Sequence, residues 1–141
     1  MRYFRNITSN INIIKYVKTQ MIIKFKKSVR DVRGTILFYS FGKSTFNFVE
    51  TKKGFSRGGH YHEFKSDHIL LRGKIEFKEI NLRTNMEQIR ILSAPYTISV
   101  ASNVAHLLTA LEDSLFLECF VTKYSAINYA PYRNIVNEKI K

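Results

Sequence analysis

The sequence predicts one all-β domain, a sandwich or barrel that ends in a short helix. A chain of 141 residues is long enough for a single apolar core without crosslinks. Eleven Phe and eight Tyr within a 45% hydrophobic composition are typical of a folded, aromatic-rich core. Short β-branched and aromatic stretches recur at even spacing between turn residues, and this pattern is typical of a sandwich or barrel.

The expected elements follow one another along the chain. A turn with Gly34 separates the first two strands, Lys52, Lys53 and Gly54 form the next turn, and Gly73 marks a hairpin. Pro131 stands near the first turn of the expected helix. Strands are expected at 22–25, 35–41, 45–51, 67–72, 75–80, 87–92, 96–100, 104–111 and 115–121, and a helix at 131–141.

The net charge of +12 is concentrated at the amino-terminal end. Residues 1–33 hold nine Lys and Arg against one acid, Asp31, and so carry +8 of that total. Such a basic end can contact nucleic acid or an anionic surface, but no helix-turn-helix, RNP-like or zinc-finger pattern accompanies it. We therefore expect a solvated terminus and no nucleic-acid partner.

Residues 1–20 contain no acid, and their apolar positions follow no sustained period. We interpret them as an accessory arm or a start-site extension, and 21–141 as the domain. No apolar run is long enough for a bilayer, so no membrane partner is expected. The single cysteine, Cys119, lies in an apolar strand, which indicates a buried thiol and a reducing, cytoplasmic location.

Three histidines and one aspartate form the most informative pattern. His60 and His62 are two residues apart, so on a strand both imidazoles leave the same face. Four residues then allow the chain to turn and bring Asp67 beside them, and His106 follows later. This donor set suits a divalent transition metal such as Zn, Fe, Mn or Ni.

The spacing of these residues resembles the cupin superfamily. Gly54, His60, His62, Asp67 and Gly73 resemble the first cupin motif, in which a glutamate usually stands at the Asp67 position. The segment 101–106, which ends at His106, resembles the second motif more loosely. Within the cupins, 57–62 is similar to the C-terminal domain of the capsular-polysaccharide epimerase–reductase, and 30–36 is similar to the start of keto-sugar-nucleotide isomerases.

The resemblance covers residues 22 to about 123 and implies a single-domain cupin, a double-stranded β-helix or jelly roll. It also implies isomerisation or epimerisation of a nucleotide-linked 4-keto-6-deoxysugar in cell-surface glycan biosynthesis. His60 and His62 then have two alternative roles, as metal ligands or as the catalytic base. Other hypotheses are a non-catalytic metal-binding cupin that holds a small molecule, and a metal-dependent dioxygenase.

Several further residues carry weaker predictions. Arg57 could clamp a phosphate bidentately or form a surface salt bridge. Tyr132 is a candidate substrate-binding residue and, with Tyr124 and Tyr129, a candidate acid or a packing residue over the barrel mouth. His68 is expected to point away from the face of Asp67. A homodimer is expected because open sheet edges need covering.

Overall fold

The computed structural model describes residues 22–141, so the arm expected at residues 1–20 lies outside the described residues. Its regular elements are all strands apart from one short helix, which confirms the all-β prediction. The elements are β1 (Ile23–Asp31), β2 (Gly34–Phe41), β3 (Ser44–Thr51), β4 (Ser56–Tyr61), β5 (Ser66–Arg72), β6 (Lys74–Asn81), β7 (Glu87–Ser93), β8 (Tyr96–Val100), β9 (Val104–Ala110), β10 (Ser114–Phe120), β11 (Ile127–Asn128) and α2 (Ala130–Glu138).

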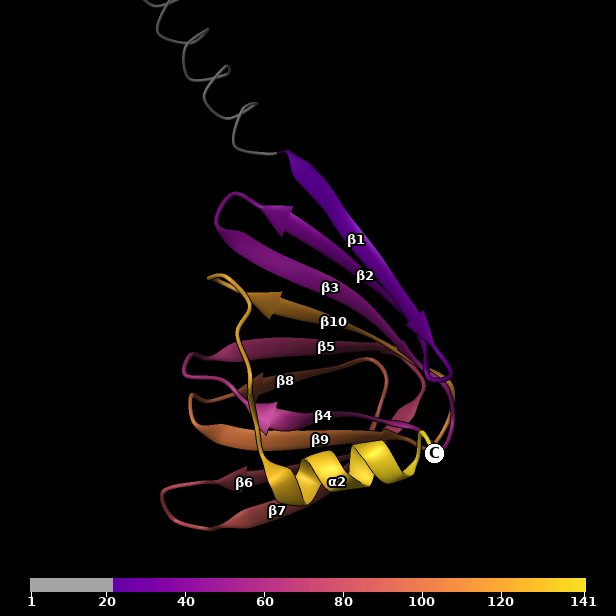
Figure 1. The fold of residues 1–141 in the computed structure, drawn as a ribbon, viewed down its shortest axis with the longest axis vertical. Helices are drawn as coiled ribbons and strands as arrows, with labels where there is room; N and C mark the ends of the chain where they lie inside the picture. The colour runs from indigo at the N-terminus through magenta and orange to yellow at the C-terminus, as the bar shows by residue number, and fades with distance from the viewer. Residues whose placement is uncertain (1–21) are drawn as a thin grey trace, which may run out of the picture.

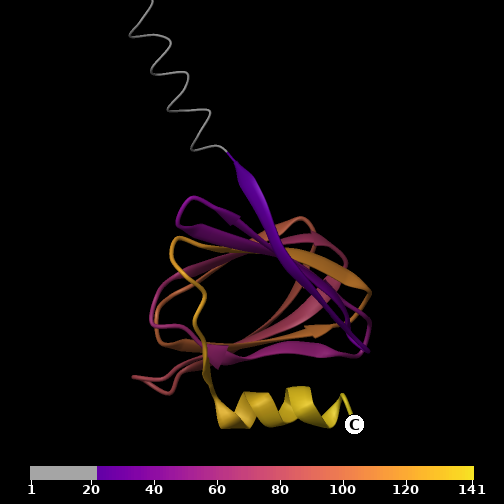
Figure 2. The ribbon, with the colours of Figure 1, turned by 45° about the horizontal axis from the view of Figure 1, so that its top comes forward.

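The strands form two antiparallel sheets that face each other (Figure 1). The large sheet has the order β1-β2-β3-β10-β5-β8, and the small sheet has the order β11-β4-β9-β6-β7. Figure 2 looks along the barrel, where the strands curve around a common interior and α2 lies outside it. Neighbours such as β3 and β10 are far apart in the sequence, as in a jelly roll.

The core lies between the inner faces of the two sheets, where alternate strand residues point inward. Val49, Leu70 and Phe116 from the large sheet meet Ile75 and Phe77 from the small sheet, and each is at most 2% exposed. The alternation predicted from the sequence therefore places the apolar residues where the two sheets meet.

The first hairpin differs from the expectation. Strand β1 runs on to Asp31, whereas the sequence predicted a strand that stops at residue 25 and a turn over 30–34. The Asp31 carboxylate accepts a hydrogen bond from the backbone N–H of Arg33 at 2.9 Å. This side-chain bond tightens the turn, so that pairing with β2 begins at Asp31 and Gly34.

Helix α2 covers the part of the outer face of the small sheet that β4 and β9 form. Tyr132 and Val136 of the helix pack against Ala105 and Leu107 of β9, and all four are at most 3% exposed. Pro131 stands in the first turn, as expected. This helix, the only one in residues 22–141, is too short to cross a membrane.

Strand β4 contains an irregularity at Gly58 and Gly59, where its register against β9 shifts. Both glycines have positive φ, +89° and +76°, which residues with a Cβ rarely adopt. The bulge lets Arg57 and His60 both reach the barrel interior, although residues three apart on a regular strand point to opposite faces. It also places His60 directly opposite His106.

Candidate metal centre

Three histidines converge inside the barrel, as the sequence predicted. His60 belongs to β4, His62 follows that strand directly, and His106 lies on β9 beside them. The ring centroid of His60 is 4.8 Å from that of His62 and 4.9 Å from that of His106. One nitrogen of each ring lies within 4.8 Å of the other two, a spacing that a single ion can bridge.

Hydrogen bonds to backbone carbonyls fix the tautomers of two rings. His62 donates from Nδ1 to the Ser125 carbonyl at 2.6 Å, and His106 donates from Nδ1 to the Val104 carbonyl at 3.3 Å. Because a carbonyl can only accept, each Nδ1 carries the proton and each Nε2 keeps its lone pair. The Nε2 of His62 is buried and has no hydrogen-bond partner, so the site fits a metal ion.

Burial keeps the three rings in the form that binds metal. It lowers the pKa of His60 to about 3 and that of His106 to about 4, with repulsion between the rings as a further cause. Burial also lowers the pKa of His62. All three imidazoles are therefore neutral near pH 7, and a weak base such as His60 is a poor proton acceptor there.

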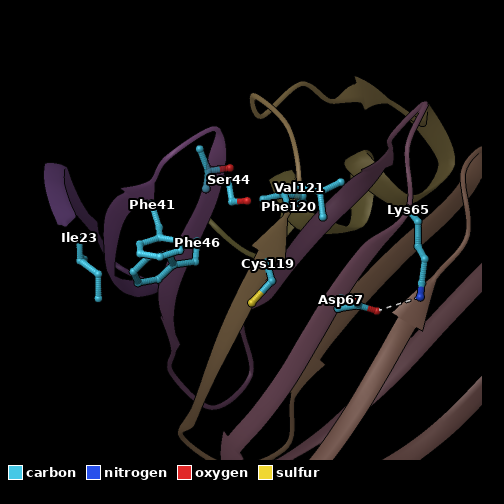
Figure 3. A pocket seen from close by; sticks show the side chains of 10 residues that line it. Ile23, Phe41, Ser44, Phe46, Lys65, Asp67, Cys119, Phe120 and Val121 are labelled. Carbon is cyan, nitrogen blue, oxygen red and sulfur yellow. Dashed lines mark ion pairs between the residues drawn. The ribbon is translucent and has the colours of Figure 1, made fainter. Parts of the chain in front are cut away.

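Asp67 does not join the histidines, contrary to the expectation from the sequence. Its carboxylate accepts a hydrogen bond from Ser99 and lies 3.6 Å from the Lys65 ammonium on the outside of the barrel (Figure 3). On β5 the inward residues are Ser66, His68 and Leu70, so Asp67 points outward. We had expected the odd-numbered residues of β5 to point inward. The turn before β5 instead directs the even-numbered residues inward.

His68 takes the inward position instead. The ring is 4% exposed, and its centroid lies 5.4 Å from that of His106. Its Nε2 shares a hydrogen bond with the Ser66 hydroxyl at 3.1 Å, and its Nδ1 lies 3.9 Å from the Glu118 carboxylate. His68 does lie on the face opposite Asp67, as predicted, but that face is the inward one, and the His68 ring packs edge-on against that of His106.

A cavity of about 190 Å³ adjoins the histidines. His60 and Arg57 line it from the small sheet, and Glu118 faces them from the large sheet. Burial raises the pKa of Glu118 to about 7, although a hydrogen bond from the Asn47 amide at 3.2 Å opposes this shift. A carboxyl group that titrates near neutral pH thus lies across the cavity from the candidate metal ligands.

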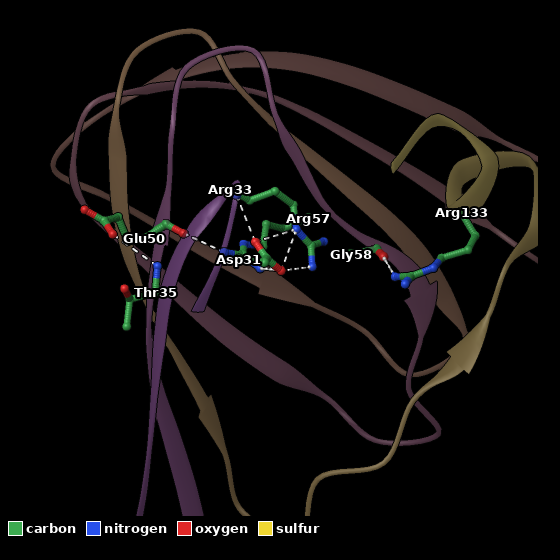
Figure 4. A network of polar contacts seen from close by, with 7 residues as sticks. All are labelled: Asp31, Arg33, Thr35, Glu50, Arg57, Gly58 and Arg133. Atoms are coloured by element: carbon green, nitrogen blue, oxygen red, sulfur yellow. Dashed lines mark hydrogen bonds and ion pairs between the residues drawn. The ribbon is translucent and has the colours of Figure 1, made fainter. Parts of the chain in front are cut away.

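Arg57 is already engaged by the protein (Figure 4). It is 6% exposed, donates to the Glu50 carbonyl at 3.0 Å, and lies 3.8 Å from the Asp31 carboxylate. Burial lowers its pKa to about 10, so the guanidinium stays charged at neutral pH. Arg57 contributes positive charge to the cavity, while its contacts tie β4 to β1 and β3.

Solved structures support the same fold. The chain resembles capsular polysaccharide assembling protein CapF from Staphylococcus aureus, with 13% identity, a TM-score of 0.60, and coverage of 76% of this chain and 34% of that one. It also resembles Bacillus subtilis oxalate decarboxylase, with 14% identity, a TM-score of 0.69, and coverage of 76% and 32%. The chain has the cupin fold.

The chain thus spans about a third of the length of those two structures. The oxalate decarboxylase has been described with Mn(II) centres, and CapF with the inhibitor 3-isopropenyl-tropolone. No protein-family model and no curated protein matches this chain. The structural similarity therefore supports the predicted jelly roll, and the chemistry has to be argued from the site.

The three tyrosines expected near the barrel mouth occupy different places. Tyr124 lies over the site, with its ring centroid 5.6 Å from that of His62, and burial raises its pKa to about 12. Tyr132 lies on α2, outside the barrel, and packs against the outer face of the small sheet, where its hydroxyl donates to the Glu87 carboxylate at 2.6 Å. The structure therefore removes Tyr132 from the site, and Tyr129 packs edge-on against it.

Sequence reasoning missed two residues of this cavity. Glu118 lies in an apolar stretch that resembles an ordinary strand. The one signal that it points inward is that it stands two residues from Phe116 and two from Phe120, which places all three on the same face. Arg133 lies on α2, donates to the Gly58 carbonyl at 3.3 Å, and forms no ion pair within residues 22–141. Nothing in the sequence links a helix residue to the barrel interior.

Proposed function

We propose that this cupin binds a divalent transition metal through His60, His62 and His106. We propose further that it isomerises or epimerises a nucleotide-linked 4-keto-6-deoxysugar for cell-surface glycans in the cytoplasm. The observation that carries this proposal is the buried Nε2 of His62, which is unpartnered and faces two further neutral imidazoles beside a positively charged cavity. Three protein ligands leave room for a substrate oxygen, as in catalytic metal sites.

A bound divalent ion would supply a Lewis acid that polarises a ketone and so acidifies the adjacent C–H. Proton transfer then needs a base that is not a ligand. Glu118 suits this role, because its pKa of about 7 lets it take up and return a proton at neutral pH. Tyr124 keeps its proton, with a pKa of about 12, and so is suited to donate a hydrogen bond or a proton.

Charge around the cavity favours an anionic substrate. Arg33, Arg57 and Arg133 line it, and Asp31 pairs with the first two of them. Arg133 is thus the arginine best placed to meet a phosphate oxygen. The cavity volume of about 190 Å³ is smaller than the ~300–1,000 Å³ typical for drug-sized ligands, so only the sugar ring would enter the barrel.

The test combines metal analysis with isotope exchange. Purified full-length protein should contain one metal ion per chain, and His106→Ala should lose it. The metal-loaded protein is then incubated in D₂O with uridine- and thymidine-diphosphate 4-keto-6-deoxyhexoses, and exchange at the carbons next to the ketone is followed by NMR. Exchange that disappears in Glu118→Gln supports the proposal, whereas no exchange with either compound overturns the enzymatic part.

The limited cavity volume also favours a second candidate. A metal-binding cupin that holds a small anion without turning it over would need only the three histidines and Arg133. Calorimetry with small carboxylates, inorganic phosphate and the two nucleotide sugars separates the candidates. Binding of the small anions without isotope exchange supports the binder, and preferential binding of the nucleotide sugars supports the enzyme.

A further inference from the structure

The first strand of the barrel buries almost nothing. Strand β1 pairs only with β2 at the edge of the large sheet, and each of its residues before Asp31 is exposed. Its start lies beside the turn that joins β2 to β3, at the end of the molecule away from α2 (Figure 1). We call residues 22–27 and 41–44 the tip. Since the tip adds little to the core, packing does not explain its composition.

The tip is strongly basic. Lys24, Lys26 and Lys43 line a hollow of about 670 Å³, and Lys27 follows with its ammonium 5.0 Å from the centroid of the Phe38 ring. The tip contains no Asp or Glu, and its four lysines form no ion pair within residues 22–141. Residues 1–21 add four Lys or Arg and no acid. Like charges that gather without a counter-charge attract an anionic surface.

Large apolar side chains protrude from the same tip. Ile22, Ile23 and Phe25 are 53%, 59% and 58% exposed. Phe41, which pairs with Ile23 across β1 and β2, is 39% exposed, and both line one side of a groove (Figure 3). Lysines interspersed with protruding apolar residues are typical of a surface that lies on a bilayer, where the apolar groups enter the lipid and the ammonium groups stay at the headgroups.

We propose that the tip docks this protein on an anionic lipid bilayer. The side chains of Ile22, Ile23 and Phe25 enter the boundary between headgroups and acyl chains, and the lysines around them meet lipid phosphates. We expected no membrane partner because no apolar run is long enough to cross a bilayer, but such a tip lies on the surface without crossing it. Anionic lipids are concentrated in the cytoplasmic leaflet, the one that the proposed location makes accessible.

The apolar residues favour a bilayer over a nucleic acid. A nucleic acid is bound by Lys and Arg together with polar donors or stacked aromatic rings. Ile22 and Ile23 offer nothing to a phosphate or a base, whereas their burial in lipid adds to the electrostatic attraction. Asp67, which lies across the groove from Ile23, is 3.6 Å from the Lys65 ammonium, so its charge opposes the approach of anionic headgroups only weakly.

Co-sedimentation of the full-length protein with vesicles tests the proposal. Wild-type protein should bind vesicles made of equal parts of phosphatidylglycerol and phosphatidylcholine, and should bind pure phosphatidylcholine vesicles much less. Lys24→Gln and Lys43→Gln should each weaken binding to the anionic vesicles about fivefold. Lys52→Gln and Lys53→Gln are the matched controls, because these exposed lysines lie in the turn at the opposite end of β3 and the charge lost is the same.

A second pair of variants tests the apolar contribution. Ile23→Ser should weaken binding to the anionic vesicles about fivefold, because a protruding side chain no longer enters the lipid. Ile91→Ser should leave the binding unchanged, although Ile91 is similarly exposed, at 54%, on β7 of the small sheet. The melting temperature of each variant is measured as well, and it should stay close to that of the wild-type protein because both side chains are exposed.

Wild-type protein that does not bind the anionic vesicles overturns the proposal. So does an equal loss of binding in the tip variants and their controls, or tighter binding to a single-stranded RNA oligonucleotide at the same phosphate concentration. If a second copy of the chain covers the tip instead, Ile23→Ser changes the sedimenting mass of the protein alone and leaves vesicle binding intact, which also overturns the proposal. None of these measurements uses metal or substrate, so the proposed enzymatic function can fail without affecting them.

Discussion

Replacing Gly58 by alanine should destabilise the protein and weaken its metal site together. A Cβ at this position would stand 2.7 Å from the backbone oxygen of His106, a candidate metal ligand. The positive φ of +89° costs a residue with a Cβ about 1–2 kcal/mol, and the forced backbone shift adds about 1–3 kcal/mol. We therefore expect the free energy of unfolding to fall by about 2–5 kcal/mol.

Gly54→Ala provides the matched control. Gly54 has nearly the same φ, +87°, but a Cβ there would meet no atom within 4 Å, so only the conformational cost of about 1–2 kcal/mol applies. Urea unfolding of both variants measures the difference. Metal titration of the folded proteins should show at least about tenfold weaker binding in Gly58→Ala and no change in Gly54→Ala. Equal destabilisation of the two variants, with unchanged metal affinity, would refute the reasoning.

Three further predictions concern the site. His106→Ala should lower metal affinity at least about 100-fold, and His68→Ala less than about tenfold, because its ring packs against His106 without a hydrogen bond to it; metal titration measures both, and a larger effect for His68 would contradict the ligand assignment. Burial lowers the pKa of His106 to about 4, below the ordinary ~6.5 of an unfolded chain. The contribution of the neutral ring to the free energy of unfolding is therefore fully present above pH ~6.5, and it is lost as the pH falls toward 4. Urea midpoints of metal-free protein check this sign, and a midpoint that rises on acidification would contradict it. Arg133→Gln should weaken binding of a nucleoside diphosphate in calorimetry and leave the melting temperature unchanged, whereas Arg57→Gln should lower the melting temperature because it breaks the contacts with Glu50 and Asp31.

The sequence predicts the fold well because each strand has its own local signal. Alternating apolar residues, β-branched residues and turn glycines mark β2, β3 and β5 to β10. Strand β4, which contains two glycines, has no such pattern and was expected only through the spacing of His60 and His62, which indicates a shared face. His106 could be added from its resemblance to a motif. These features depend on residues that are close in sequence, where strand geometry constrains the outcome.

The remaining site residues depend on information that the sequence does not carry locally. Which residues of β5 point inward depends on the number of residues in the preceding turn. An error of one residue in that number exchanges the inward position of His68 with the outward position of Asp67. Arg57 reaches the interior only because of the bulge at Gly58 and Gly59. Arg133 reaches the cavity only because α2 docks beside β4, a tertiary contact with no sequence pattern of its own.

All three candidate ligands belong to the small sheet or directly follow one of its strands, whereas Glu118 and Asn47 face them from the large sheet. One wall of the barrel would therefore hold a bound metal, and the opposite wall supplies none of the candidate ligands. A substitution at position 47 can change which molecule the barrel accepts without removing a candidate ligand or Glu118. A barrel divided in this way can acquire new ligands while its three histidines are inherited intact.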